Sequence, residues 1–170
     1  MRRLALLAAC LALVLPGSAS AMVDNQYAKW KLFQPYGYRD LKLEPARWKI
    51  RSLSYHAGLD FTVAMGLHRI AVHAKANGFS RFYTVSKKIT CSNLFAAAPT
   101  GCKGTSLDEE VDIVAVGFND SDAVPACEET GDWAANCRSF DADETLAYLR
   151  EPLGLSAAQV EQEIKDASVP

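Results

Sequence analysis

The histidines are the first residues to consider for metal or acid–base chemistry. His68 and His73 fall in one predicted helix, five residues apart. At about 100° per residue they point roughly 140° away from each other, whereas a metal-binding pair on one helix face needs a spacing of four. We therefore predict that His68 packs or hydrogen-bonds near a sheet, that His73 is solvated, and that neither binds a metal. His56, just before Gly58, could approach His68 through the turn, although nothing in the pattern requires it.

Other catalytic signatures do not occur in the sequence. It has no Gly-x-Ser-x-Gly nucleophile elbow and no glycine-rich phosphate loop. Arg69 lies within the apolar run of the helix, where we expect it to pair with an acid such as Asp40 or Asp60 as a structural clamp. The sequence therefore points to no catalytic residue, no metal site and no cofactor.

An acidic stretch at residues 119–122, followed by Glu128, Glu129 and Asp132, could gather oxygen ligands around calcium. The glycine and bidentate glutamate of a standard calcium loop are not at the required spacing. A solvated surface loop is the favoured interpretation, because acidic loops of this kind are common.

Four cysteines follow the N-terminal region: Cys91, Cys102, Cys127 and Cys137. An even number in an exported chain predicts disulfides, with three possible connectivities. If the strand ending near Ile89 turns back into a strand at 111–118, the first two cysteines lie at one end of a hairpin and the last two follow the other end.

A strand of this length spans roughly 30 Å, which is far beyond the reach of a disulfide. We therefore predict the local pairs Cys91–Cys102 and Cys127–Cys137. A zinc site built from all four is the alternative, and it is disfavoured because neither pair has the two-residue spacing of zinc ligands.

The first 21 residues have the composition of an export signal. Two arginines precede an apolar run from Leu4 to Leu15, and the small residues 19–21 form a cleavage site. Cleavage after Ala21 would leave a single domain at 22–170, and no second long apolar run predicts a transmembrane span. Cys10 resembles a lipidation site, but the apolar run continues past it, so lipid anchoring is the minority interpretation.

Charge excludes some partners. Removing Arg2 and Arg3 leaves 16 basic and 20 acidic side chains, a net charge of about −4. This balance argues against nucleic acid or anionic lipid as the main partner.

The pattern of apolar residues predicts the elements that position these groups. A helix at 59–77 ends at Gly78 and leads into a buried strand at 79–89, in which Phe82 is predicted to lie in the core. Earlier strands carry Leu41 and Trp48, and capping signals at Asp141 and Ser156 open two later helices. We predict an α+β fold: a mixed sheet of about four strands with a right-handed βαβ crossover, packed by helices, with two disulfide-stapled loops.

Several short motifs resemble a family of small bacterial cell-envelope proteins, many described as lipoproteins. They are Gly-Tyr-Arg-Asp at 37–40, Trp-x-Ile at 48–50, Leu-His-Arg-Ile-Ala at 67–71 and Gly-Phe-x-x-Phe at 78–82. The resemblance covers about residues 36–90 and implies a fold and an envelope location, without implying a reaction.

The loop between Cys91 and Cys102 is unusually apolar, with Leu94 and Phe95 near its tip. These side chains either fold back onto the domain or, held by the disulfide, contact a protein partner in the envelope. We expect an exported, periplasmic or extracellular, non-enzymatic binding or structural module. The alternative is a periplasmic hydrolase or small-ligand enzyme whose site no short motif reveals.

Overall fold

The computed structural model describes residues 27–32, 36–55, 57–93, 96–98 and 108–168. Some of the expectations above therefore lie outside the described residues. These are the signal peptide, Cys10, His56, Leu94, Phe95 and Cys102.

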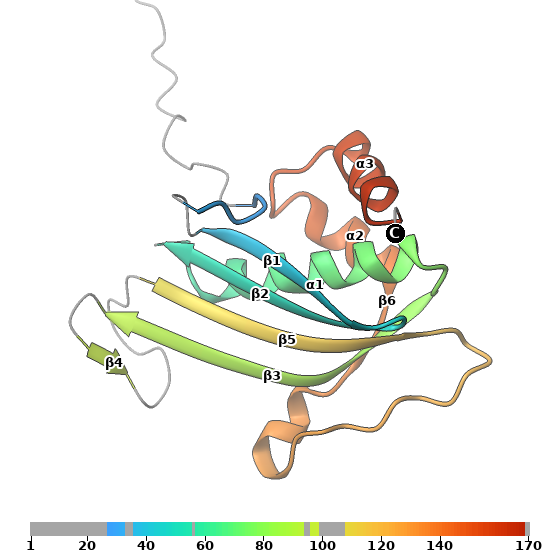
Figure 1. Cartoon of the computed structure of the whole chain (residues 1–170), viewed down its shortest axis with the longest axis horizontal. Helices are drawn as coiled ribbons and strands as arrows, with labels where there is room; N and C mark the ends of the chain where they lie inside the picture. Colours follow the sequence, from blue (N-terminus) through green and yellow to red (C-terminus); the bar gives the residue numbers. More distant parts are fainter. Residues whose placement is uncertain (1–26, 33–35, 56, 94–95, 99–107, 169–170) are drawn as a thin grey trace, which may run out of the picture.

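A six-stranded sheet forms the centre of the protein, in the order β1-β2-β5-β3-β4, with β6 also pairing with β3. The strand pairings are all antiparallel. Figure 1 shows the long strands side by side, with the helices gathered behind them and at one end. The strand bounds are β1 Gly37–Glu44, β2 Arg47–Tyr55, β3 Arg81–Asn93, β4 Ala96–Ala98, β5 Asp108–Phe118 and β6 Ser139–Asp141.

The predicted α+β class is confirmed, whereas the predicted mixed sheet of about four strands is wrong. β5 lies between β2 and β3 and is antiparallel to both. β2 and β3 therefore run in the same direction but are not neighbours in the sheet. The expected handedness of their connection through the first helix stays a prediction.

Three helices lie on one side of the sheet: α1 Leu59–Ala76, α2 Ala142–Arg150 and α3 Ala157–Ala167. α1 packs directly on the strands, and α2 and α3 pack mainly on α1. α1 ends where Gly78 adopts a φ of 80°, a conformation that glycine reaches without a Cβ penalty. Asp141 caps α2 through the Glu144 N–H, and Ser156 and Gln159 form a complete capping box on α3. A short 3₁₀ helix, η1 Gly131–Asn136, precedes β6. No helix in the described part of the chain is both long and apolar enough to cross a bilayer.

The core lies between the sheet and α1. Trp48 is 1% exposed and Phe82 is fully buried, so both predictions of core residues are confirmed. Burial alternates along β2, which leaves the second face of the sheet open. On that open face Leu41 of the edge strand β1 remains 53% exposed.

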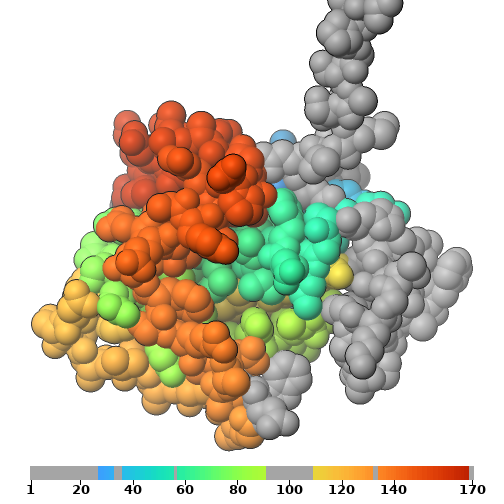
Figure 2. Space-filling model, turned by 180° about the vertical axis from the view of Figure 1, so that it is seen from behind, coloured from blue at the N-terminus to red at the C-terminus, as the bar shows by residue number. Residues whose placement is uncertain are grey.

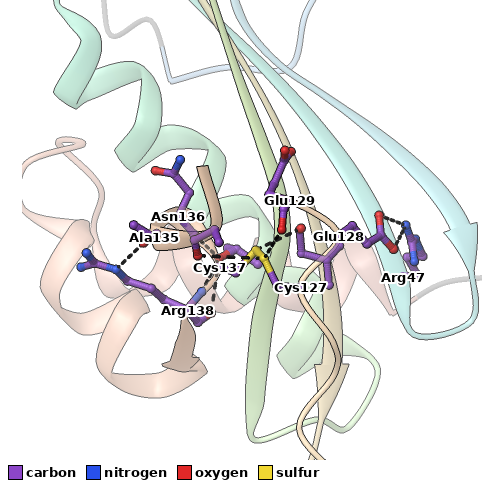
Figure 3. The surroundings of a disulfide bond; sticks show 11 residues. Arg47, Cys127, Glu128, Glu129, Ala135, Asn136, Cys137 and Arg138 are labelled. Atoms are coloured by element: carbon purple, nitrogen blue, oxygen red, sulfur yellow. Dashed lines mark hydrogen bonds and ion pairs between the residues drawn. A yellow bond between two sulfur atoms is a disulfide. The ribbon is translucent and has the colours of Figure 1, made fainter. Parts of the chain in front are cut away.

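A disulfide joins Cys127 to Cys137, with Cα atoms 5.6 Å apart, as predicted (Figure 3). Cys91 lies in β3, but Cys102 is outside the described residues, so the pair Cys91–Cys102 stays a prediction.

Candidate functional site

A polar cavity of about 410 Å³ opens between β1, the C-terminal half of α1 and α3. Figure 1 shows these three elements meeting at the end of the molecule where the chain finishes. Figure 2 shows α2, in orange-red, and α3, in red, beside the green surface of α1. We call the cavity between β1, α1 and α3 the polar cavity. Its lining is Lys29, Tyr38, Asp40, Lys42, Trp48, Arg69, His73, Asn77, Glu163, Asp166 and Ala167.

Arg69 is the centre of the charge network beside the cavity. Its Nη2 lies 2.6 Å from Oδ2 of Asp40, and its Nη1 lies 3.2 Å from Oε2 of Glu163. The guanidinium also sits 4.3 Å from the ring centroid of Tyr38, a cation–π contact. Of the two acids predicted to pair with Arg69, the structure brings Asp40 to it.

The charges of this pair are fixed. Burial alone would lower the pKa of Arg69, but the Asp40 carboxylate, with smaller contributions from Tyr27 and Tyr38, holds that pKa above its usual value. Burial alone would raise the pKa of Asp40, but His73 and Arg69 hold it below its usual value. Near neutral pH, both groups therefore remain ionised.

The prediction that His73 is solvated is wrong. Its Nε2 lies 3.0 Å from Oδ2 of Asp40, and its ring stacks on Trp48 with centroids 5.8 Å apart. Arg69 and His73 are four residues apart on α1, so they share the helix face that meets β1 and β2. The face of α1 that carries His73 was predicted to be exposed to solvent, but the sheet covers it.

His68 is completely buried and hydrogen-bonded, as predicted, but its partner is Tyr27 in the segment before β1. The Tyr27 hydroxyl donates its proton to Oε2 of Glu163, at 2.6 Å. Because that proton is already used, Nδ1 of His68 must donate to the Tyr27 oxygen, at 2.7 Å. Burial lowers the pKa of His68 to about 3, so the ring is neutral. Burial likewise raises the pKa of Tyr38, to about 12.

Several polar groups on the cavity wall have hydrogen-bonding capacity that the described protein atoms do not use. Nε1 of Trp48, Nε of Arg69 and Oδ1 of Asp40 are buried without a hydrogen-bond partner among the described residues. Lys29 and Lys42 make no ion pair with any described residue. A buried polar group without a partner costs about 1–3 kcal/mol, so such groups call for an explanation.

Four titratable groups in or beside the cavity are poorly suited to proton transfer near neutral pH. A general acid or base works best with a pKa near the operating pH. Asp40 and Arg69 are held charged, whereas His68 and Tyr38 are held neutral. Within the described ranges, no three His, Cys, Asp or Glu side chains are grouped so as to hold a metal ion.

In the acidic loop after β5, Asp122 and Glu128 use their carboxylates in contacts with other protein groups. Asp122 accepts from the Asn119 N–H, at 2.7 Å, and closes a turn. Glu128 pairs with Arg47 at 2.6 Å (Figure 3). These contacts agree with the interpretation of the loop as a surface connection.

Sequence reasoning missed the cavity residues outside β1 and α1. Lys29 precedes the sheet, and Glu163 and Asp166 come from the last helix, which reads only as an amphipathic helix with a polar face. The one available signal was that Glu163 and Asp166 are three residues apart and so share a helix face.

Leu94 and Phe95 lie outside the described residues, so their predicted contact with a partner stays a prediction. Comparisons with protein-family models, with curated proteins and with solved structures found no match for this chain.

Proposed function

We propose that this protein is an exported, non-enzymatic binding module of the bacterial cell envelope, and that the polar cavity holds a small hydrophilic ligand. The N-terminal export signature and the envelope-family motifs at 36–90 support the location. The observation that carries the binding role is the indole N–H of Trp48, which lacks a partner among the described residues although Trp48 is 1% exposed and lines the cavity.

The unused groups define the ligand further. Trp48 Nε1 and Arg69 Nε are donors, and Lys29 and Lys42 carry positive charges without ion pairs in the described structure. Oδ1 of Asp40 is a buried acceptor among the cavity atoms that have no hydrogen-bond partner in the described structure. A small anion that also carries a hydroxyl group would pair with both the donors and the acceptor. Its negative charge would lie toward the lysines, and its hydroxyl would donate to Asp40.

Native mass spectrometry tests this proposal directly. The mature protein is isolated from its native envelope fraction, with the sequence that remains after export. We expect a small bound mass that is reproducible between preparations and is released on denaturation. N-terminal sequencing of the same sample should begin at Met22 if the export signal is cut as expected.

Two variants test whether the ligand binds in the polar cavity. Trp48→Phe removes the indole N–H and keeps an aromatic ring, and Lys42→Met removes one cavity charge. Both should lose the bound mass while retaining a cooperative melting transition. Arg39→Met, on the open face of the sheet, should keep it. If the wild type carries no mass, or all variants carry it equally, the polar cavity is not the binding site. Conversion of the ligand during incubation would instead indicate an enzyme.

A further inference from the structure

A second cavity, of about 330 Å³, lies between α1, strands β3 and β5, and the end of η1 with the segment that follows it. Its apolar wall includes Val63 and Leu67 from α1 and Ile113 from β5. Lys87 and Arg138 supply two positive charges, and no carboxylate belongs to its described lining. We call it the Lys87 cavity.

A β-bulge places Lys87 on the inner face of the sheet. The register of β3 against β5 shifts between Thr84 and Ser86, so Lys87 pairs with Ile113, which is itself fully buried under α1. An inserted residue reverses which side chains point to each face of a strand. The next residue, Lys88, is exposed, with its Cα opposite that of Asp112.

The two cations have no acidic partner in the described part of the chain. Arg138 donates from Nε to the carbonyl of Ala135 at 3.1 Å, as Figure 3 shows, and Lys87 makes no ion pair with a described residue. Burial and the charge of Arg138 lower the pKa of the Lys87 ammonium. Two like charges beside an apolar wall are unfavourable unless an anion offsets them.

We propose that the Lys87 cavity binds a small amphipathic acid, with its carboxylate between Lys87 and Arg138 and its aliphatic chain against Val63, Leu67 and Ile113. The volume falls within the range of small-molecule sites. The ligand class differs from that of the polar cavity, because the wall here is aliphatic. The inference is independent of the proposed function.

Isothermal titration calorimetry with sodium octanoate tests the proposal on the mature protein with its disulfide intact. Acetate supplies the carboxylate without the chain, and octan-1-ol supplies the chain without the charge. We expect octanoate to bind at least about tenfold more tightly than either, since acetate lacks the chain that packs on the apolar wall and octan-1-ol lacks the charge-assisted hydrogen bonds. Equal affinity for octanoate and octan-1-ol would overturn the proposal.

Variants at neighbouring lysines separate the site from general surface charge. Lys87→Met should weaken octanoate binding at least about tenfold and leave octan-1-ol binding unchanged, whereas Lys87→Arg should preserve octanoate binding. Lys88→Met, one residue along the same strand but exposed, should match the wild type. Octanoate should also shift the amide NMR signals of residues 84–87 and 135–140. Shifts confined to other residues, or unchanged affinity in Lys87→Met, would show that the cavity is only a gap in the packing.

Discussion

Nδ1 of His68 lies 2.7 Å from the hydroxyl of Tyr27, although 41 residues separate them in the chain. The hydroxyl in turn donates to Glu163, and Arg69 joins Glu163 to Asp40. This single network ties the segment before β1, β1 itself, α1 and α3 together. The polar cavity is thus bounded by elements whose relative positions depend on buried polar contacts.

The network makes stability depend on pH through His68. Its pKa is about 3 in the folded protein and about 6.5 when unfolded. As pH falls below 6.5 the unfolded chain takes up a proton that the folded chain does not, so the stability present above pH 6.5 is lost toward pH 3. We expect a loss of about 1.4 kcal/mol from this residue between pH 7.5 and 5.5.

Urea unfolding at the two pH values, for wild type and His68→Gln, measures this loss. The variant has no titrating ring at this position, so its stability should change less between the two values. The same pH dependence in both proteins would mean that the pKa of His68 is the same in the folded and the unfolded chain.

Arg69→Met should destabilise the protein by about 3–5 kcal/mol, because it leaves the carboxylates of Asp40 and Glu163 without their buried cation. Adding Asp40→Asn to Arg69→Met should recover part of the loss, giving a coupling energy in a double-mutant cycle. Arg39→Met, one residue from Asp40 but exposed on the other face, should change stability by less than about 0.5 kcal/mol. Denaturant unfolding measures the wild type, Arg69→Met, Asp40→Asn, the double variant and the Arg39→Met control. Additive effects would show that Arg69 and Asp40 do not interact.

The sequence predicted features that local chemistry determines. Gly78 ends α1 because only the left-handed conformation closes the helix there, and Ser156 with Gln159 begins α3 as a capping box. These two predictions needed only a few neighbouring residues. The pairing of Cys127 with Cys137 needed one more step, the predicted hairpin that β3 and β5 form.

The features that the sequence did not reveal depend on long-range packing. Glu163 meets Arg69 across 94 residues, and no spacing rule connects the two positions. His73 is covered because β1 and Trp48 lie over that face of α1. Lys87 faces inward only because of a one-residue bulge, which no local signal in β3 predicted.

Phe82→Ala should cost about 3–5 kcal/mol, since the ring is fully buried and stacks on Phe140 with centroids 5.1 Å apart. Tyr148→Ala removes an aromatic ring that is 80% exposed, so it should change stability by less than about 0.5 kcal/mol. Thermal and urea unfolding give both values. A loss below about 1 kcal/mol for Phe82→Ala would mean that the strand faces are assigned incorrectly.

The disulfide should stabilise both the fold and the Lys87 cavity. Cys127 and Cys137 close a short loop with a sequence separation of 10, worth about 2–3 kcal/mol in the loop-entropy model. The segment between them contains η1, and Asn136, next to Cys137, lines the Lys87 cavity. The double variant Cys127→Ser/Cys137→Ser should therefore unfold at lower urea concentration and bind octanoate more weakly than the wild type. Adding a reductant should reproduce the weaker octanoate binding in the wild type and leave octanoate binding by the variant unchanged. A further loss of stability in the reduced variant would report the predicted Cys91–Cys102 disulfide. If the variant lost stability but bound octanoate with unchanged affinity, η1 would not be needed to form the cavity.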